Sequence, residues 1–263
     1  MPAQDPGHGG AAGAGGAPGA AEPAAWRFVI RADERSAALE GFSVEPAPPS
    51  TTIIREHGVR YRVDLTGGHK TGFFCDQRDN RRRFAGFCRD AAVLDCCCYS
   101  GGFGLCAKLL GGASEVTSVD LDETALALAR DNANLNQTRI KHVHADAFPY
   151  LRQMHGNGAL YDAIVLDPPK LALTRRDVDD ALRKYHDLNV LACQVLRPGG
   201  LLLTCSCSGL VSEPTFRDVV FRAGRRAGRR LQLLAASAAA ADHPVADNCP
   251  ETAYLKALWL RVP

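Results

Sequence analysis

The sequence lacks any apolar run approaching the ~18 residues that a bilayer-spanning helix needs, so it predicts no membrane segment. Its first 25 residues contain no Lys or Arg, which excludes the basic start of a secretory signal and an Arg-rich transit peptide. We therefore expect a soluble, cytoplasmic protein that has no membrane partner.

Metal-site spacing is also missing, although the chain has 10 cysteines. No two of them form a C-x-x-C pair; they occur as a row at 96–98, on alternate positions at 205 and 207, and singly. Neither a disulfide framework nor a structural zinc site has this arrangement. We expect mostly free thiols in a reducing compartment, and no metal.

A strong excess of one charge is absent too, because the net charge is only +2 and the pI is about 8.1. Any nucleic-acid binding must therefore come from local basic patches.

The chain divides into three predicted parts. Residues 1–25 are almost entirely Gly, Ala and Pro, which predicts a disordered tail. Residues 26–67 form a small β-rich appendage, because residues 51–65 alternate around a turn at 56–58 in the manner of a β-hairpin. Residues 68–263 are long enough for one α/β domain.

From residue 91 onward, short apolar strands alternate with helical segments, which indicates a parallel sheet covered on both faces. The last two strands have no helix between them, so they should be antiparallel. The predicted fold is α/β and Rossmann-like, with a mixed seven-stranded sheet. The expected strands are AAVLDCC, EVTSVD, IKHVHAD, YDAIVLD, GLLLTCS, LQLLAAS and YLKALWLRV, and the expected helices lie near 102–110, 123–136, 147–154, 178–196 and 214–227.

Acidic residues end three successive strands, at Asp95, Asp120 and Asp146. The carboxyl ends of parallel strands form the ligand-binding edge of such a sheet. There Asp120 could accept hydrogen bonds from the ribose hydroxyls of an adenosine. Asp146, which is followed by Ala147, could accept one from the adenine amine. Each carboxylate, taken singly, could equally cap a helix. Between the first two lies a turn of small residues that lets the backbone approach a ligand, comprising Tyr99, Ser100, Gly101, Gly102 and Phe103. Its spacing is not the G-x-G-x-x-G of a dinucleotide site, so a dehydrogenase is disfavoured.

The next two strands end in Asp167-Pro168-Pro169-Lys170 and in a segment containing Cys205 and Cys207. A thiolate suits addition to carbon 6 of a pyrimidine, which activates carbon 5 for methylation. Asp167 could hydrogen-bond the base and stabilise the charge that develops. A strand cysteine is often only a small buried hydrophobic residue, but the end of this strand, beside the D-P-P turn, favours a functional one.

Several motifs occur in the order found in a known family. They are KTGFFCDQRDNR at 70–81, VLDCCCYSGGF at 93–103, DPPK at 167–170, SCSGL at 206–210, His243-Pro244, Pro250-Glu251 and Tyr254-Leu255-Lys256. Over roughly residues 52–263 the chain resembles the class I 23S rRNA cytosine-C5 methyltransferases of the one-cysteine type. Members usually carry an RNA-binding PUA module before the catalytic part, and we expect this sequence to lack it.

The resemblance implies S-adenosylmethionine (SAM) as cofactor and Cys207 as the nucleophile. It also implies that Phe73, Asp76, Gln77 and Arg78 close over the cofactor. The expected partner is RNA, either 23S rRNA or a ribosomal assembly intermediate, and a homodimer is left open.

Candidate RNA contacts lie beside the catalytic turn. Pro168, Pro169 and Lys170 continue from Asp167, Arg175 and Arg176 follow them, and His243 could reach the site from a late loop. The arginines at 222–230 are better explained as a solvated helix face.

Two other functions remain open from the sequence. Methylation of an rRNA base nitrogen would use the same cofactor without a thiol, and a non-catalytic domain could bind SAM and RNA only.

Overall fold

The computed structural model describes residues 30, 34–45, 48, 50–66 and 72–263. The chain separates into two compact units, Met1–Pro46 and Ala47–Pro263. In the first unit the structure describes a helix, α1 (Glu34–Glu40), that the sequence analysis did not predict within its β-rich appendage. The predicted disordered tail, residues 1–25, lies outside the described residues.

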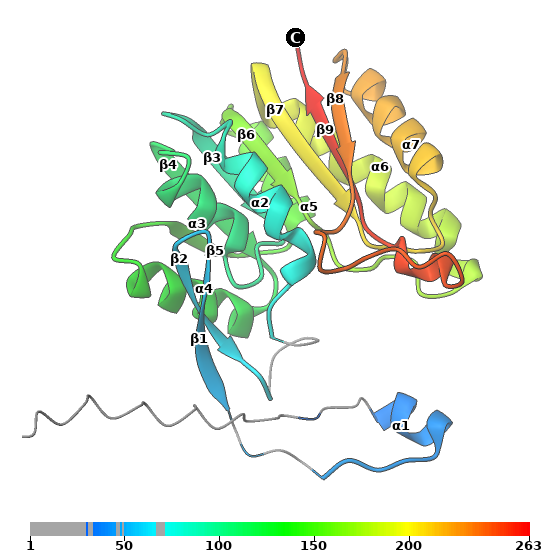
Figure 1. Ribbon diagram of the computed structural model, residues 1–263. Helices are drawn as coiled ribbons and strands as arrows, with labels where there is room; N and C mark the ends of the chain where they lie inside the picture. Colours follow the sequence, from blue (N-terminus) through cyan, green and yellow to red (C-terminus); the bar gives the residue numbers. More distant parts are fainter. Residues whose placement is uncertain (1–29, 31–33, 46–47, 49, 67–71) are drawn as a thin grey trace, which may run out of the picture. The chain divides into compact units, whose positions relative to one another are not determined.

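The second unit contains the predicted mixed sheet of seven strands, in the order β5-β4-β3-β6-β7-β9-β8. The five strands β3 to β7 are parallel, and β9 lies between β7 and β8 and is antiparallel to both (Figure 1). This confirms the predicted fold class and the antiparallel finish of the sheet. The strands are β3 (Ala92–Cys96), β4 (Glu115–Asp120), β5 (Lys141–His144), β6 (Tyr161–Leu166), β7 (Leu196–Ser206), β8 (Gln232–Ser237) and β9 (Lys256–Arg261).

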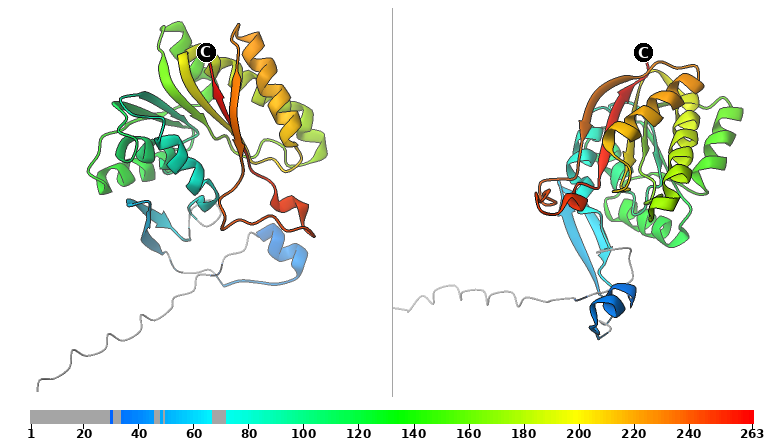
Figure 2. Two further views of the ribbon diagram at one scale, coloured as in Figure 1. Left: turned by 45° about the horizontal axis from the view of Figure 1, so that its top comes forward. Right: turned by 90° about the vertical axis from the view of Figure 1, so that its right-hand side faces the viewer.

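Helices cover both faces of the sheet (Figure 2). Alternate residues of the central strands enter two different cores: Leu94 and Ile164 pack with α5, α6 and α7, whereas Val93 and Val165 pack with α2 and α3. The helices are α2 (Arg78–Ala85), α3 (Gly102–Leu109), α4 (Glu123–Leu135), α5 (Ala147–Gly156), α6 (Val178–Val195) and α7 (Glu213–Arg226), with single 3-10 turns η1 (Cys75–Gln77), η2 (Arg175–Asp177) and η3 (Pro250–Thr252).

The predicted hairpin is formed by β1 (Thr51–Glu56) and β2 (Val59–Asp64). Positive φ angles at both turn residues, His57 and Gly58, match the twist that a two-residue hairpin turn requires. The hairpin packs on α4, where Asn132 and Asn136 accept hydrogen bonds from the backbone of β2 at 2.7 and 3.0 Å. It therefore belongs to the same compact unit as the sheet, although the predicted boundary at residue 67 separates the two.

No helix of the described residues is both long and apolar enough to cross a membrane. No disulfide joins any of the 10 cysteines, all of which fall in the described part of the chain. A cluster of three or more metal-ligating side chains is likewise absent from the described residues.

Candidate active site

The candidate nucleophile and the candidate orienting acid follow neighbouring parallel strands. Asp167 comes directly after β6 and Cys207 directly after β7, and these two strands pair in the sheet. The Cys207 sulfur lies 3.9 Å from the carbonyl oxygen of Pro168, the residue after Asp167. The D-P-P turn and the thiol are thus brought together at the carboxyl edge of the sheet, as the sequence analysis predicted.

The two cysteines of this segment have different environments. Cys205 has no exposed surface and packs in the core shared with α2 and α3. Burial, followed by the nearby charge of Asp167, raises the pKa of the Cys205 thiol well above its usual value, so this sulfur is held as an inert thiol. Cys207 lies beyond the strand end and is only half-buried, so it is not enclosed in this core.

Asp167 is held by the segment that precedes α2. The Gln77 amide donates a hydrogen bond to Asp167 Oδ1 at 3.0 Å, while its own oxygen accepts from Asn80 at 2.7 Å. On the other side, the Asp167 backbone N–H donates to the carbonyl of Cys96 at the end of β3. The carboxylate and the backbone of Asp167 are therefore each held by a hydrogen bond before any substrate binds.

Four predicted acidic residues influence one side chain that the sequence analysis did not single out, Cys97. Burial raises the pKa of the Cys97 thiol, and the next contributions, in decreasing order, are the charges of Asp120, Asp167, Asp95 and Asp146. Carboxyl groups from the ends of β3, β4, β5 and β6 are therefore all close enough to Cys97 to affect its thiol. The cysteine row immediately after the first strand was the only signal for this position.

The three strand-end carboxylates have distinct local roles. Asp95 is buried behind the glycine turn, where Oδ2 accepts from the Gly104 N–H at 2.8 Å, and burial raises its pKa to about 7. Asp120 stands at the rim and accepts from the Tyr99 N–H at 2.7 Å. Asp146 accepts from the Phe148 N–H at 2.7 Å and so caps α5, whose first residue is Ala147. Helix capping was the alternative explanation for each of these acids, and it holds for Asp146. The helix that follows β4 is α4, and its N-cap is Asp122 and not Asp120.

The glycine turn is tightly built. Gly101 has φ +81, and a Cβ there would lie 3.2 Å from that of Ala129 on α4. Gly102 has a similar constraint, since its Cβ would lie 2.8 Å from Arg81 Cδ. The backbone of Ser100 accepts a hydrogen bond from Asn132 at 3.1 Å, and Phe103 turns into the core, edge-on to Phe84.

The segment from Phe73 to Arg78 lies between the hairpin and the late loop, which is the stretch of residues 238–255 that joins β8 to β9. Phe73 is only 5% exposed and packs against Tyr61, whereas Phe74 contacts Tyr99 of the glycine turn edge-on, with ring centroids 4.9 Å apart. The sequence analysis placed Phe73, and not Phe74, over the cofactor. Arg78 forms an ion pair with Asp242 at 2.7 Å, which joins this segment to the late loop.

One carboxylate oxygen of Asp76 is buried without a hydrogen-bond donor among the described residues. Its Oδ2 accepts from the Tyr254 hydroxyl at 2.6 Å, but its Oδ1 is buried and has no hydrogen-bond partner among the described residues. A buried, unsatisfied carboxylate oxygen is costly unless a ligand supplies a donor.

Comparisons with known proteins identify the family of this chain. Residues 15–261 match the family model described as S-adenosylmethionine-dependent methyltransferase. The chain belongs to this methyltransferase family.

Two curated relatives share the name ribosomal RNA large subunit methyltransferase I. The protein from Tolumonas auensis is 46% identical over 237 residues, covering 89% of this chain and 59% of the relative. The protein from Aeromonas salmonicida is 45% identical over 231 residues, covering 87% of this chain and 57% of the relative. The chain thus spans less than two thirds of the length of these relatives.

Solved structures share the fold. SMU.776, crystallised in complex with SAH, superposes with a TM-score of 0.73 at 25% identity, covering 84% of this chain and 58% of that one. The SAM-dependent methyltransferase from Agrobacterium tumefaciens has a TM-score of 0.62 at 22% identity, covering 81% and 70%.

The residues present in this methyltransferase fit SAM. The unsatisfied Oδ1 of Asp76 suits the ammonium group of an amino acid, and the rim carboxylate of Asp120 suits ribose hydroxyls. Family membership confirms the predicted cofactor, while the individual cofactor contacts remain predictions.

The predicted substrate residues of the methyltransferase are mostly on the surface. Pro168 is buried, but Pro169, Lys170, Arg175 and Arg176 are exposed.

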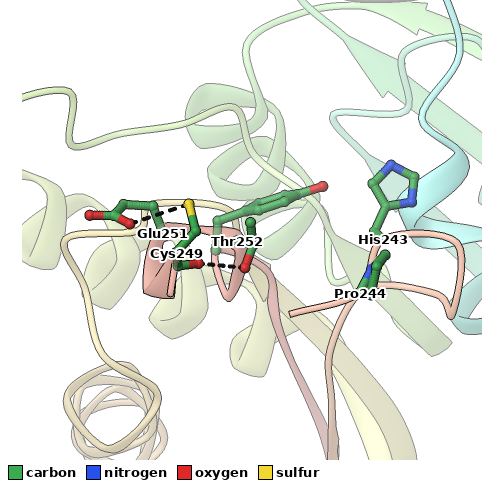
Figure 3. Close-up of a pocket in the computed structure, with 6 residues that line it drawn as sticks. His243, Pro244, Cys249, Glu251 and Thr252 are labelled. Atoms are coloured by element: carbon green, nitrogen blue, oxygen red, sulfur yellow. Dashed lines mark hydrogen bonds between the residues drawn. The ribbon is translucent and has the colours of Figure 1, made fainter. Parts of the chain in front are cut away.

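The late loop forms a pocket of about 300 Å³. Figure 3 shows His243 and Pro244 on one side of it and Cys249, Glu251 and Thr252 on the other. Tyr254 completes the lining and lies near the nucleophile, since burial, then Asp76, then Cys207 raise the pKa of its hydroxyl.

Proposed function

We propose that this chain transfers the methyl group of SAM to carbon 5 of a cytosine in 23S rRNA. The observation that carries the proposal is the pair of strand ends at which the half-buried Cys207 sulfur lies 3.9 Å from the carbonyl following Asp167. The names of the curated relatives support ribosomal RNA as the substrate class. The motif pattern described above supports cytosine carbon 5 within that class.

Carbon 5 of cytosine is a poor nucleophile by itself. The reaction therefore needs a group on the protein that first adds to the ring. The Cys207 thiolate adds to carbon 6, and the electron pair of the 5,6 double bond becomes available at carbon 5. SAM, when bound, supplies an electrophilic methyl group on a sulfonium. After methyl transfer, a proton acceptor removes the proton from carbon 5. The Cys207 sulfur then leaves carbon 6, which restores the 5,6 double bond. Asp167, in its protonated form, donates a hydrogen bond to N3 of the cytosine and accepts one from the exocyclic amine, and so stabilises charge on the ring while the sulfur is attached.

The RNA partner would be 23S rRNA or a ribosomal assembly intermediate, and the site of action the cytoplasm. Lys170, Arg175 and Arg176 are exposed near Asp167 and suit contacts with RNA phosphates. A homodimer is compatible with this function but not required by it.

The decisive test uses RNA in which 5-fluorocytosine replaces cytosine. Fluorine at carbon 5 cannot leave as the proton does, so the protein should remain covalently attached and survive denaturing electrophoresis. The adduct should form with the wild type and with Cys205→Ala, the matched control for the buried neighbour. It should be absent with Cys207→Ala, while calorimetry shows that this variant still binds SAM.

Retained methyl transfer by Cys207→Ala would overturn the proposal in favour of a base nitrogen, whose lone pair attacks without a thiol. SAM binding without methyl incorporation into any ribosomal RNA would instead indicate a non-catalytic domain.

A further inference from the structure

A buried lysine stands next to the candidate nucleophile. Lys256 is the first residue of β9, is only 6% exposed, and pairs across the sheet with Ser206. Its ammonium donates hydrogen bonds to the carbonyl of Ser208 at 2.6 Å and to that of Tyr254 at 2.7 Å. Because Ser208 is the residue after Cys207, these bonds fix the cation to the backbone that carries the thiol.

Burial of this lysine lacks the usual compensation. No carboxylate forms an ion pair with Lys256 anywhere in the described residues. Charged side chains are almost never buried unless they are paired. Burial lowers the pKa of Lys256 to about 8, the charge of Cys207 opposes that change, and the nearby Lys170 reinforces it. Lys256 is therefore still mostly protonated at pH 7, and Cys207 is the neighbouring group whose negative charge, when ionised, favours the protonated lysine.

We propose that Lys256 is a positioning residue whose ammonium group stabilises the Cys207 thiolate. The proton released by the thiol goes to solvent water, and the lysine keeps its own. This role deepens the proposed function, because a thiolate adds to carbon 6 whereas a thiol does not. The inference itself concerns only the state of the sulfur and can be tested without RNA.

The other groups near the sulfur cannot supply this charge. Asp167 carries a carboxyl group and supplies no positive charge. Tyr185 on α6 and Tyr254 are neutral, since burial raises the pKa of both hydroxyls, and Cys205 is held as a thiol for the same reason. Lys170 is exposed, so solvent screens its effect.

The test is the pH dependence of Cys207 alkylation by iodoacetamide, followed by mass spectrometry of the peptide that contains it. In Lys256→Met the midpoint of the pH profile of Cys207 alkylation should rise by about one pH unit. The alkylation rate at pH 7 should then fall about tenfold. Lys256→Arg keeps the charge and should remain close to the wild type. Cys249, an exposed thiol in the same protein, should react at the same rate in every variant and is the internal reference.

An unchanged Cys207 profile in Lys256→Met would overturn the proposal. If that variant does not fold, as judged by SAM calorimetry and urea unfolding, Lys256→Gln is used, because its amide can still donate to a backbone carbonyl without charge. The same rise in midpoint is expected there, and its absence would be equally decisive. A shifted profile combined with no adduct on 5-fluorocytosine RNA would reject the proposed function and leave the role of Lys256 intact.

Discussion

Arg81 donates two hydrogen bonds to Glu56, through Nε and Nη2, and both are 2.7 Å long. The two side chains come from α2 and from the end of β1 and are only 4% and 6% exposed. The same guanidinium donates to the Phe74 carbonyl at 2.9 Å, covers the Phe73 ring at 4.6 Å and packs against Gly102. One arginine thus links the hairpin, the segment before α2 and the glycine turn.

Replacing Arg81 alone should be strongly destabilising. Arg81→Met leaves the Glu56 carboxylate buried without its cation, and a broken buried pair costs about 3–5 kcal/mol. The double variant Glu56→Leu with Arg81→Met leaves no unpaired charge and should be more stable than the single one. Urea unfolding of both variants measures this difference. Equal losses in the two would show that the unpaired charge is not the cause.

The glycine turn can be tested with a matched pair of glycines. Gly101 and Gly112 both have positive φ, but a Cβ at Gly112 meets nothing within 4 Å, whereas at Gly101 it would press on Ala129. Gly112→Ala should cost about 1 kcal/mol from backbone strain alone. Gly101→Ala should cost more and also weaken SAM binding in calorimetry. Equal effects on SAM affinity would argue that the turn does not shape the cofactor site.

Stability should depend on pH through Asp95. Its folded pKa of about 7 lies above the ordinary value of 3.8, so the folded state holds a proton that the unfolded state has lost between these values. This group therefore lowers stability as the pH rises from about 4 to about 7, and has no further effect above that range. In Asp95→Asn this part of the pH dependence should disappear. Urea unfolding at pH 4, 5.5 and 7 gives the comparison, and parallel profiles would contradict it.

RNA binding should depend on Arg175 and Arg176 but not on Arg225 and Arg226. The first pair follows the carboxyl end of β6, whereas the second ends α7 at the opposite edge of the sheet; all four are exposed. Replacing Arg175 and Arg176 with Ala should raise KM for RNA with little change in kcat. The dependence of log binding constant on log salt should become shallower by about 1.4. The Arg225 and Arg226 double variant is the control, and an equal loss there would mean that RNA binds by overall charge.

The sequence predicted those parts of the fold that follow local periodicity. Strands such as Tyr161–Leu166 are apolar on both faces, and Asp146 marks the start of its helix by capping it, so element order and the strand-end carboxylates could be located. The seven-residue helix at Glu34–Glu40 is too short to show a clear helical period and was missed.

Contacts between distant residues could not be predicted in this way. Glu56 and Arg81 are 25 positions apart, and Asp76 and Tyr254 are 178 apart. Neither pair has a spacing that marks it, because their proximity depends on how the hairpin and the late loop pack. The buried position of Lys256 has the same origin. The motif pattern pointed to its neighbourhood, but its contact with the Ser208 carbonyl becomes visible only when β9 is paired with β7.

The placement of β9 has a consequence for biosynthesis. Although β9 is synthesised after β7 and β8, it occupies an interior position in the sheet, between those two strands. Until it emerges, the growing polypeptide exposes the unpaired flank of β7, and the thiol at its tip has no neighbouring ammonium. A nascent chain interrupted before residue 256 should therefore be prone to aggregation, and its Cys207 thiol should be less reactive than in the complete sheet.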